Sequence, residues 1–450
     1  MRNAPPDQLQ YIVARAKDQS QSPFPFALIS LIFLGLGSFV LYWQLLEIGN
    51  LAQNIPEFVS IYLALSILYL VAAWLYRKRA FSNHIRFILG FAIIFRIVLL
   101  GTHPSLSDDI YRYRWEGYLQ TEGINPYRFS PDAIELRGFR NEGWTKVNNK
   151  TAAAIYPPLM LMIHAAIYSM HGSVWSYKVA FLTADMGLIF ILLRLLPMYG
   201  LERERVIYYA WNPLTIVEVA GSGHHDVVVV CLLLGSVLLC LKSRQVASLL
   251  AYSAAVLCKF YPVLGVPFLL KRVSRRYWFW LPVTILMGYF PYVSARGHIF
   301  DSLLFYKDKW RFNGFLFKRF SGFFESETMP EYLLLAGSLF LVAWLLLTTK
   351  TLLEQIYWVT GIVLLCAPTL FPWYLIWIAP FLCFFPTASW LLLTCLCALS
   401  YHVLIPWWTL GVWQSDDLFL KLQYYPFYAM LITTSLQKVW KKNSLAPTRS

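Results

Sequence analysis

Long apolar stretches that carry few charges recur along most of the chain. Because ~20 apolar residues in a helix cross the hydrocarbon core of a bilayer, the longer stretches predict membrane-spanning helices and the shorter ones tilted or broken helices. The stretches lie at 26–46, 55–76, 85–100, 176–196, 206–221, 226–241, 246–259, 260–271, 277–295, 331–349, 355–368, 372–385, 388–405 and 421–440. The pattern predicts an all-α polytopic membrane protein, with a bundle of about 12–14 transmembrane helices.

The stretch 156–171 is apolar as well, but Pro157 and Pro158 open it and His164 lies near its middle. If it crossed the membrane, all later basic loops would be exported, against the tendency of Lys and Arg to stay on the cytoplasmic side. We therefore interpret it as a juxtamembrane helix on the outer surface, because proline is tolerated in a first turn. Both termini are then cytoplasmic. The basic loops that fix this orientation include Arg77, Lys78, Arg79, Arg86, Arg203, Arg205, Lys242, Arg244, Lys271, Arg272, Arg275 and Arg276.

This topology divides the chain into a cytoplasmic tail over 1–25, one transmembrane domain over 26–440 and a second cytoplasmic tail over 441–450. Two large polar segments fall on the outer face, at 101–175 and 296–330. The first concentrates acidic and basic side chains, so we interpret it as an outer catalytic loop.

Composition removes several classes of protein. Hydrophobic residues make up 58% of the chain and charged residues 14%, which is well below the ~25% charged residues of globular proteins and excludes a soluble enzyme or a disordered chain. The seven cysteines lie in apolar runs without a CxxC spacing, which excludes a disulfide scaffold. The net charge of +14 fits basic cytoplasmic loops and anionic lipid better than nucleic acid. The bilayer is therefore an expected partner, and nucleic acid is not.

The densest polar segment predicts an amphipathic helix on the outer surface. Ser107 is a plausible N-cap residue, and Asp108 and Asp109 fall in the first turn, where carboxylates suit the helix dipole. Arg112 and Glu116 share a face at an i, i+4 spacing. An apolar stripe follows at helical spacing, formed by Tyr111, Trp115 and Leu119. The two aspartates either cap this helix or present carboxylates for chemistry.

A second polar cluster, Gly221-Ser222-Gly223-His224-His225-Asp226, lies at the outer end of one predicted span and the start of the next. On this topology it lies on the same face as Asp109, and we expect the two to share one site. Polar groups at such a junction in a membrane protein indicate a functional site. Adjacent histidines point apart on a helix, and no third ligand has zinc-like spacing. We therefore expect no metal and no cofactor, and favour contacts with a phosphate or a sugar hydroxyl.

Isolated charges elsewhere have two interpretations each. Lys259 lies at an outer helix end, where it either reaches the interface or binds an anion. Lys307 and Arg311 belong to a basic outer segment rich in aromatic residues, which either offsets an anionic ligand or contacts lipid headgroups. Asp185 and Glu218 are acids within predicted spans, so each must pair internally or be protonated.

Five segments together resemble a known enzyme family. SDDIYRYRWEGYLQTEGINPYRFSPD, ELRGFRNEGWTKVNN, AAIYPPL, AWNPLTIVEVAGSGHHD and CKFYP follow one another over roughly 100–262. The set resembles the GT-C glycosyltransferases and, more narrowly, bacterial family 87 and the polyprenol-phosphomannose-dependent α-1,6-mannosyltransferases. The resemblance implies a multi-helix membrane enzyme with outer juxtamembrane helices and a polyprenyl-phosphate-sugar donor. The family's loop aspartate corresponds best to Asp109, with Asp108 as the second choice.

The chemistry implied by the resemblance needs a base and a set of cations. A carboxylate accepts the proton of the attacking acceptor hydroxyl, and the departing lipid phosphate needs charge stabilisation rather than an acid. One displacement without a covalent intermediate predicts inversion. The candidate residues for binding the lipid phosphate or sugar are Arg112, Arg114, Glu116, Tyr156, His224, His225, Asp226, Lys259, Lys307 and Arg311.

The resulting hypothesis is transfer of a sugar, mannose by resemblance, to a glycan or glycolipid acceptor on the periplasmic face of a bacterial inner membrane. The same fold with another hexose or aminosugar donor is an alternative. A transporter or flippase of lipid-linked substrates is another, although the chain shows no pair of matching halves. A catalytically silent scaffold subunit is the third, and the paired aspartates argue against it.

Overall fold

The computed structural model describes residues 24–78, 83–326, 328–348 and 350–444. Within these ranges the chain is helical, with isolated bridge pairs between residues 312–313 and Thr369 in place of any strand. The tails over 1–23 and 445–450, and basic residues such as Arg79, lie outside the described residues. The all-α class predicted from the sequence is confirmed.

The first part of the chain forms three long helices, then a group of outer elements, then a fourth long helix. These are α2 (Phe24–Ile48), η1 (Leu51–Gln53), α3 (Ile55–Arg77), α4 (Ile85–Leu100), α5 (Asp109–Thr121), η2 (Ile134–Phe139), α6 (Glu142–Thr145), α7 (Pro158–Met170) and α8 (Val174–Met198). The lipid-facing side of α2 carries the exposed residues Ile29, Phe33, Leu36, Val40 and Trp43, a stripe at helical spacing that fits contact with acyl chains.

The second part of the chain is made of shorter and more often interrupted helices. In order these are η3 (Arg203–Val206), α9 (Ile207–Ala210), α10 (Pro213–Thr215), the π-helix η4 (Ile216–Gly221), α11 (Asp226–Leu241), α12 (Gln245–Cys258), η5 (Tyr261–Gly265), α13 (Val266–Leu270), η6 (Arg275–Tyr277), α14 (Trp280–Tyr289), η7 (Phe290–Phe300), α15 (Asp301–Lys309), α16 (Phe315–Ser321), α17 (Met329–Leu346), α18 (Leu352–Cys366), η8 (Pro372–Trp377), η9 (Ala379–Cys383), α19 (Ala388–Leu396), η10 (Cys397–Val403), α20 (Leu404–Leu410) and α21 (Asp417–Ser444).

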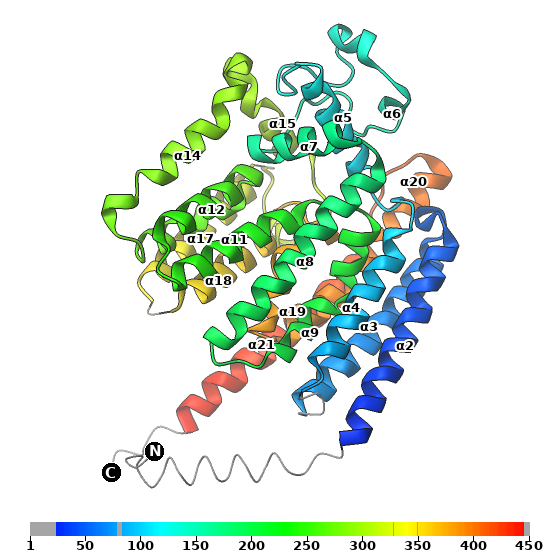
Figure 1. Ribbon diagram of the computed structural model, residues 1–450, viewed down its shortest axis with the longest axis vertical. Helices are drawn as coiled ribbons and strands as arrows, with labels where there is room; N and C mark the ends of the chain where they lie inside the picture. Colours follow the sequence, from blue (N-terminus) through cyan, green and yellow to red (C-terminus); the bar gives the residue numbers. More distant parts are fainter. Residues whose placement is uncertain (1–23, 79–82, 327, 349, 445–450) are drawn as a thin grey trace.

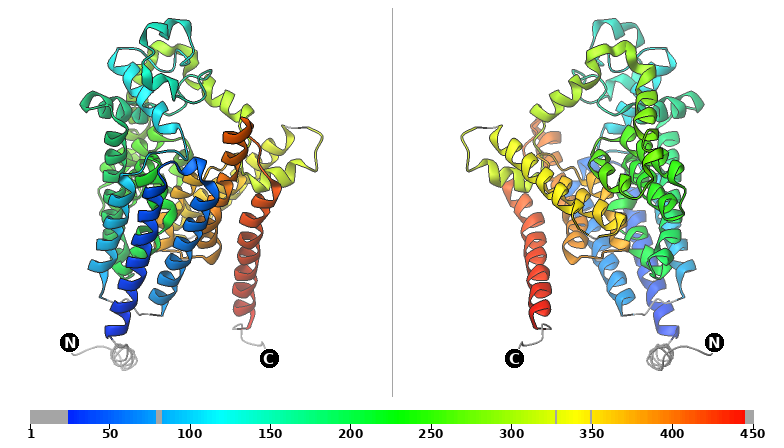
Figure 2. Two further views of the ribbon diagram at one scale, coloured as in Figure 1. Left: turned by 90° about the vertical axis from the view of Figure 1, so that its right-hand side faces the viewer. Right: turned by 90° about the vertical axis from the view of Figure 1, so that its left-hand side faces the viewer.

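The bundle has two distinct ends. The start of α2 and the end of α21 lie together at one end, and α5, α6 and α7 lie at the opposite end (Figures 1 and 2). This arrangement fits the predicted separation of the tails from the outer catalytic loop. Which end faces the cytoplasm stays a prediction.

Five helices are long and apolar enough to cross a membrane, counted within the described residues: α2, α3, α8, α17 and the continuous helix Ala388–Leu410. A sixth is gained if the bent pair Pro213–Gly221 and Asp226–Leu241 is one span. Several other predicted stretches are shorter apolar helices. The polytopic membrane class is therefore confirmed, whereas a total of about 12–14 spans stays a prediction.

The predicted stretch 206–221 is broken into pieces instead of forming one helix. Pro213 has no N–H to give to the preceding turn, and the buried Asn212 side chain accepts a hydrogen bond from the Leu214 N–H at 3.1 Å. A π-helix follows, and the chain then turns by 118° into α11. The bend falls at the glycine- and histidine-rich cluster Gly221–Asp226, which we call the corner.

The juxtamembrane interpretation of 156–171 agrees with α7, whose 13 residues are too few to span a bilayer. α7 packs directly on α5 at Gly117, where a Cβ atom would lie 2.4 Å from Tyr177 Oη and 2.5 Å from the His164 carbonyl oxygen. Only glycine permits this approach, which fixes α5 on the outer layer of the bundle.

Each of the two acids predicted within spans accepts a hydrogen bond from a buried side chain. Asp185 Oδ2 accepts from Arg96 Nε at 2.5 Å, and both side chains are almost fully buried. Tyr209 Oη donates to the other oxygen of the same carboxylate. Glu218 accepts from Tyr401 Oη at 2.8 Å. Asp185 is therefore paired with a cation, whereas Glu218 accepts from a neutral phenol. For Glu218 the choice between an internal pair and a protonated acid stays open.

Candidate active site

Asp109 occupies the first position of α5, and its side chain does not cap the helix. The backbone N–H of Asp109 donates to Ser107 Oγ at 3.3 Å, and Asp108, at the N-cap position, makes no side-chain capping bond. Capping therefore does not explain the two aspartates. Asp108 is exposed, whereas 22% of the Asp109 side chain is accessible.

The two carboxylate oxygens of Asp109 have different neighbours. Oδ1 accepts a hydrogen bond from Asn148 Nδ2 at 2.9 Å, and Oδ2 lies 4.0 Å from His224 Nδ1. Residues more than a hundred positions apart in the sequence thus meet at one point. The predicted meeting of the loop aspartate with the glycine- and histidine-rich corner is present in the structure.

Burial sets the protonation of Asp109. It raises the pKa of this carboxyl to about 6, while the Asn148 hydrogen bond and the Lys259 charge act to lower it. A base is most effective when its pKa lies near the working pH. With this pKa the Asp109 carboxyl is mostly ionised at neutral pH, and its pKa lies close enough to neutral pH for it to accept a proton readily.

The corner itself is shaped by Gly223, whose φ of +76° is costly for residues with a Cβ. A Cβ atom there would also lie 2.6 Å from Ile110 Cδ1 on α5. Because the backbone passes so close to α5, the corner reaches the start of that helix.

The two histidines of the corner point in different directions, as expected. His224 stacks on Trp373 with ring centroids 4.1 Å apart, and its Nε2 lies 3.6 Å from Glu218 Oε2. His225 Nδ1 lies 3.1 Å from His164 Nε2. The His224 ring therefore lies between the Asp109 and Glu218 carboxylates without a hydrogen bond to either, and His225 joins the corner to α7.

Asp226 and Lys259 form a buried ion pair behind the corner. Asp226 Oδ1 also accepts from Trp377 Nε1 at 2.6 Å. The Lys259 ammonium lies 4.7 Å from the ring centre of Tyr374 and 5.8 Å from that of Tyr156. Lys259 therefore does not extend to the membrane interface, and its charge sits beside the aromatic wall described below.

Arg112 lines the cavity of Asp109 described below, and its guanidinium is bound to protein groups. Its Nε donates to Glu116 Oε1 at 2.7 Å, the predicted i, i+4 pair. Its terminal nitrogens donate to four backbone carbonyls, those of Asn148, Asn149, Ala152 and Ala153. These bonds use the donors of the guanidinium, so Arg112 holds the loop that carries Asn148 in place.

Glu116 is likewise a packing partner of the site and does not line it. It is buried between Arg112 and His164, with Oε2 3.7 Å from His164 Nδ1. Burial acts to raise the pKa of Glu116, but Arg112 and His164 lower it below the ordinary value overall. Glu116 is absent from the lining of the cavity described below, and its contact with substrate stays a prediction.

Two other predicted cations lie away from Asp109. Arg114 faces a separate cleft on the other side of α5, where its Nε donates to the Gly172 carbonyl at 2.7 Å. Arg311 pairs with Glu331 and lines a third pocket. The side chain of Lys307 lies outside the described residues. Arg114 and Arg311 therefore line other pockets than the one in front of Asp109, and their contact with a phosphate stays a prediction.

A cavity of about 690 Å³ opens in front of Asp109. Its polar end is formed by Asp108, Asp109, Asn148 and Asn149. Its other walls are aromatic, with Tyr156, Trp310, Phe371, Trp373, Tyr374, Trp407, Trp408 and Trp413 among them. The indoles of Trp407 and Trp408 are about half exposed. One cavity therefore joins a carboxylate to a surface that suits an apolar chain.

Several buried polar atoms next to this cavity have no hydrogen-bond partner within the described residues. They are both ring nitrogens of His224, Glu218 Oε2, Asp226 Oδ2 and His225 Nε2. Buried polar groups are usually paired. None of these four residues is among those that line the cavity, so the unpaired atoms lie behind its wall. No group of three or more His, Cys, Asp or Glu side chains in the described part of the chain has a metal-binding arrangement, and metal independence stays a prediction.

Comparison with known proteins assigns the family. A profile described as "Alpha-(1->6)-mannopyranosyltransferase, N-terminal domain" matches residues 26–275, more than half of the chain. The protein belongs to this family. It is 23% identical over 197 residues to alpha-(1->6)-mannopyranosyltransferase A of Mycobacterium tuberculosis, and 24% identical over 182 residues to the protein of that name from Corynebacterium glutamicum.

These alignments cover 42% and 38% of this chain, and 36% of each relative. The chain therefore matches about a third of the length of these curated relatives. No solved structure matches it.

The matched region contains the polar half of the site. Asp109, Asn148, His224 and Lys259 all lie within 26–275, the part that this mannopyranosyltransferase family shares. The aromatic wall from Trp310 to Trp413 lies beyond it. The acidic loop and the corner thus belong to the family's N-terminal domain, and the residues that follow complete the cavity.

Sequence reasoning missed four residues of the site: Lys146, Asn148, Trp373 and Trp377. Asn148 lies in the segment KVNN, 39 positions after its partner Asp109. The two tryptophans come from the proline-interrupted stretch PWYLIW. In this stretch two tryptophans follow a proline that interrupts the helix. This combination was the sequence feature that could have indicated an aromatic wall.

Proposed function

We propose that this protein transfers a mannosyl unit from a polyprenyl-phosphate-linked donor to a glycan or glycolipid acceptor, with inversion at the anomeric carbon. Asp109 is the general base. Membership of the mannopyranosyltransferase family supports the sugar and the reaction class. The observation that carries the mechanism is the partly buried Asp109 carboxylate, which opens onto the aromatic cavity beside His224.

In the proposed step the acceptor hydroxyl gives its proton to Asp109 as its oxygen attacks the anomeric carbon. The new glycosidic bond forms while the bond from that carbon to the phosphate oxygen breaks, and the lipid phosphate leaves with the electron pair. A β-linked donor gives an α-glycoside, because a single displacement inverts the centre. Such a base contributes typically 10²–10⁴-fold to the rate.

The donor phosphate needs positive charge near the polar end of the cavity. Lys146 lines the cavity directly. Lys259 lies just behind it, against the rings of Tyr156 and Tyr374 that form the wall. We assign the phosphate to these two lysines, in place of Arg112, Arg114 and Arg311. The exposed indoles of Trp407 and Trp408 support a path for the polyprenyl chain toward the bilayer.

The site is placed on the periplasmic side of a bacterial inner membrane, with both tails in the cytoplasm. The position of α5 at the end of the bundle opposite the start of α2 (Figure 1) supports this orientation, together with the basic loops on the other side.

Transfer assays with the purified full chain test the proposal. Polyprenyl-phosphate mannose and an α-1,6-mannobiose acceptor are incubated with wild type, Asp109→Asn and the matched control Asp132→Asn, an exposed acid of the same loop. We expect an α-linked product from wild type and the control, and at least a 100-fold loss with Asp109→Asn. Full activity of Asp109→Asn would remove the general-base assignment. Movement of an intact donor across a vesicle without cleavage would support a flippase instead.

A further inference from the structure

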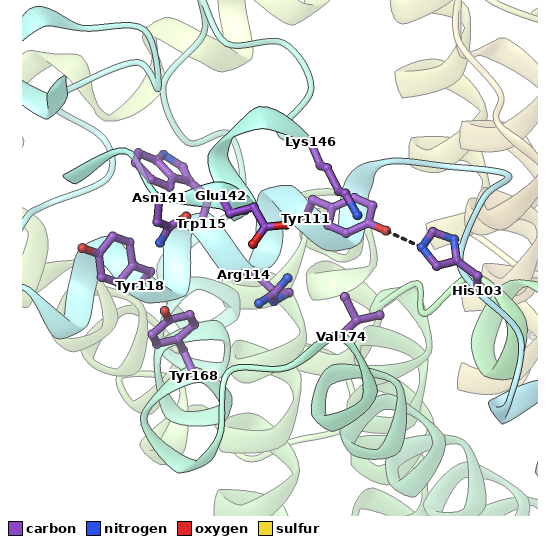
Figure 3. Close-up of a pocket in the computed structure, with 11 residues that line it drawn as sticks. His103, Tyr111, Arg114, Trp115, Tyr118, Asn141, Glu142, Lys146, Tyr168 and Val174 are labelled. Carbon is purple, nitrogen blue, oxygen red and sulfur yellow. Dashed lines mark hydrogen bonds between the residues drawn. The ribbon is translucent and has the colours of Figure 1, made fainter. Parts of the chain in front are cut away.

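A second cleft lies on the opposite side of α5 from Asp109, with a volume of about 370 Å³ (Figure 3). One face of the helix lines it, with Tyr111, Arg114, Trp115 and Tyr118 at intervals of three and four residues. Asp109 and Arg112 lie on the other face. The helix therefore separates the cleft from the cavity of the proposed base.

The two spaces share a wall. His103, Tyr111 and Lys146 line both of them. Tyr111 Oη and His103 Nε2 lie 3.1 Å apart in a hydrogen bond that forms part of this partition (Figure 3). A ligand in the cleft is thus directly adjacent to the space in which the acceptor hydroxyl reacts.

The floor of the cleft is aromatic. The rings of Tyr118 on α5 and Tyr168 on α7 lie 5.5 Å apart, and those of Trp115 and Tyr118 lie 5.8 Å apart. Aromatic faces are electron-rich and apolar, so they suit the C–H face of a pyranose ring. Trp115 is 3% exposed, and its indole N–H has no hydrogen-bond partner within the described residues.

The rim of the cleft carries both acidic and basic side chains. Glu142 is exposed on α6, and Lys146 is exposed just after that helix. Among the described hydrogen bonds, Arg114 makes one, from its Nε to the Gly172 carbonyl. A carboxylate accepts from hydroxyls and a guanidinium donates to them. The negative charge of Glu142 would repel an anionic ligand. A rim that carries both an acid and cations therefore fits a neutral compound with several hydroxyls.

We infer that this cleft binds neutral mannose units of the oligosaccharide acceptor, next to the unit whose hydroxyl reacts at Asp109. The inference rests on the proposed function for the identity of the sugar. The cleft volume falls in the ~300–1,000 Å³ range of small-ligand sites. Its position beside α6, at the far end of the bundle from the start of α2 (Figure 1), suits a water-exposed glycan better than a lipid headgroup.

Binding of α-1,6-mannotriose to the full chain, measured by titration calorimetry without donor, tests the inference. Wild type should bind, and Glu142→Gln and Trp115→Phe should weaken binding roughly tenfold, as expected for loss of one hydrogen bond to a sugar hydroxyl. Trp115→Phe keeps an aromatic ring but removes the N–H. The control Glu135→Gln, an exposed acid of η2 outside the cleft, should bind as wild type does.

Kinetics provide the second readout. In Glu142→Gln the KM for mannotriose should rise more than the KM for a single mannoside, so the preference for the longer acceptor falls. Unchanged mannotriose binding in both cleft variants would overturn the inference. Binding of inorganic phosphate at the cleft, strengthened in Glu142→Gln, would also overturn it in favour of an anionic ligand.

The test separates this inference from the proposed function. If Asp109-dependent transfer to mannobiose occurs but the cleft variants behave as wild type, the acceptor cleft is wrong and the transferase stands. If mannotriose binds through Glu142 and Trp115 but no sugar is transferred, the carbohydrate-binding cleft stands and the proposed function falls.

Discussion

Replacing Asp109 by Asn should stabilise the protein while it abolishes transfer. Burial raises the pKa of this carboxyl from its ordinary value of 3.8 to about 6. Since one pKa unit corresponds to about 1.36 kcal/mol, keeping the carboxylate ionised in the folded state costs about 3 kcal/mol at neutral pH. Asparagine has nearly the same shape, carries no charge and can still accept the hydrogen bond from Asn148.

The pH dependence gives the sign of this effect. The pKa of Asp109 is higher in the folded than in the unfolded state, so the carboxylate destabilises the fold only where it is ionised. The cost is absent well below pH 3.8, where both states are protonated, grows between about pH 4 and 6, and is complete above about pH 7. The melting temperature of Asp109→Asn should therefore exceed that of wild type at pH 7.5, and the difference should fall to a small fraction of that value at pH 4.

Thermal unfolding of the purified proteins, followed by intrinsic fluorescence between pH 4 and 8, measures this difference. Asp132→Asn is the matched control, because the Asp132 side chain is exposed and its replacement should leave the melting temperature nearly unchanged. A melting temperature of Asp109→Asn at or below that of wild type at pH 7.5 would refute the reasoning. It would mean that the site stabilises the carboxylate, which then has too low a pKa to act as the base.

Three further changes test the surroundings of the site. Asn148→Ala removes a hydrogen bond that lowers the pKa of the Asp109 carboxyl. Under the proposed mechanism the acidic limb of the pH–rate profile should therefore move above about pH 6, with activity lost more at pH 6 than at pH 8. Arg96→Met leaves Asp185 unpaired in the core and should cost about 3–5 kcal/mol in thermal unfolding, whereas Arg96→Met with Asp185→Leu should recover most of it. Gly223→Ala should reduce both activity and melting temperature, because the new Cβ meets α5 and the φ is positive. Gly221→Ala, where the nearest atom is 3.7 Å away, should be tolerated when the two are assayed together.

Local sequence signals predicted the elements of the site, and long-range contacts decided their roles. The helical spacing of the Arg112–Glu116 pair is a property of one helix, so the sequence was enough to predict it. The four carbonyls that occupy the rest of Arg112 lie 36–41 residues away, and no periodicity reports on them. The same reason explains why the sequence did not indicate the contact of Asn148 with Asp109 or the pairing of Arg311 with Glu331.

The prediction that Asp109 meets His224 had a different basis, namely that both segments fall at the outer ends of spans. Topology brings such segments to one face, but the distance of 4.0 Å depends on two glycines. Gly223 lets the corner pass Ile110, and Gly117 lets α5 rest on α7. A residue with a Cβ at either position would push α5 away and separate the carboxylate from the histidine.

α5 is therefore the element on which the whole site depends. It is an amphipathic helix of 13 residues, and each of its long sides faces a different cavity. The side with Asp109 and Arg112 meets the aromatic cavity and orders the loop of Asn148. The side with Trp115 and Tyr118 forms the second cleft. Because one rigid helix supplies both surfaces, the position of a sugar bound in the cleft is fixed relative to the carboxylate, which is the condition for a positioned base to act on one hydroxyl of a polymer.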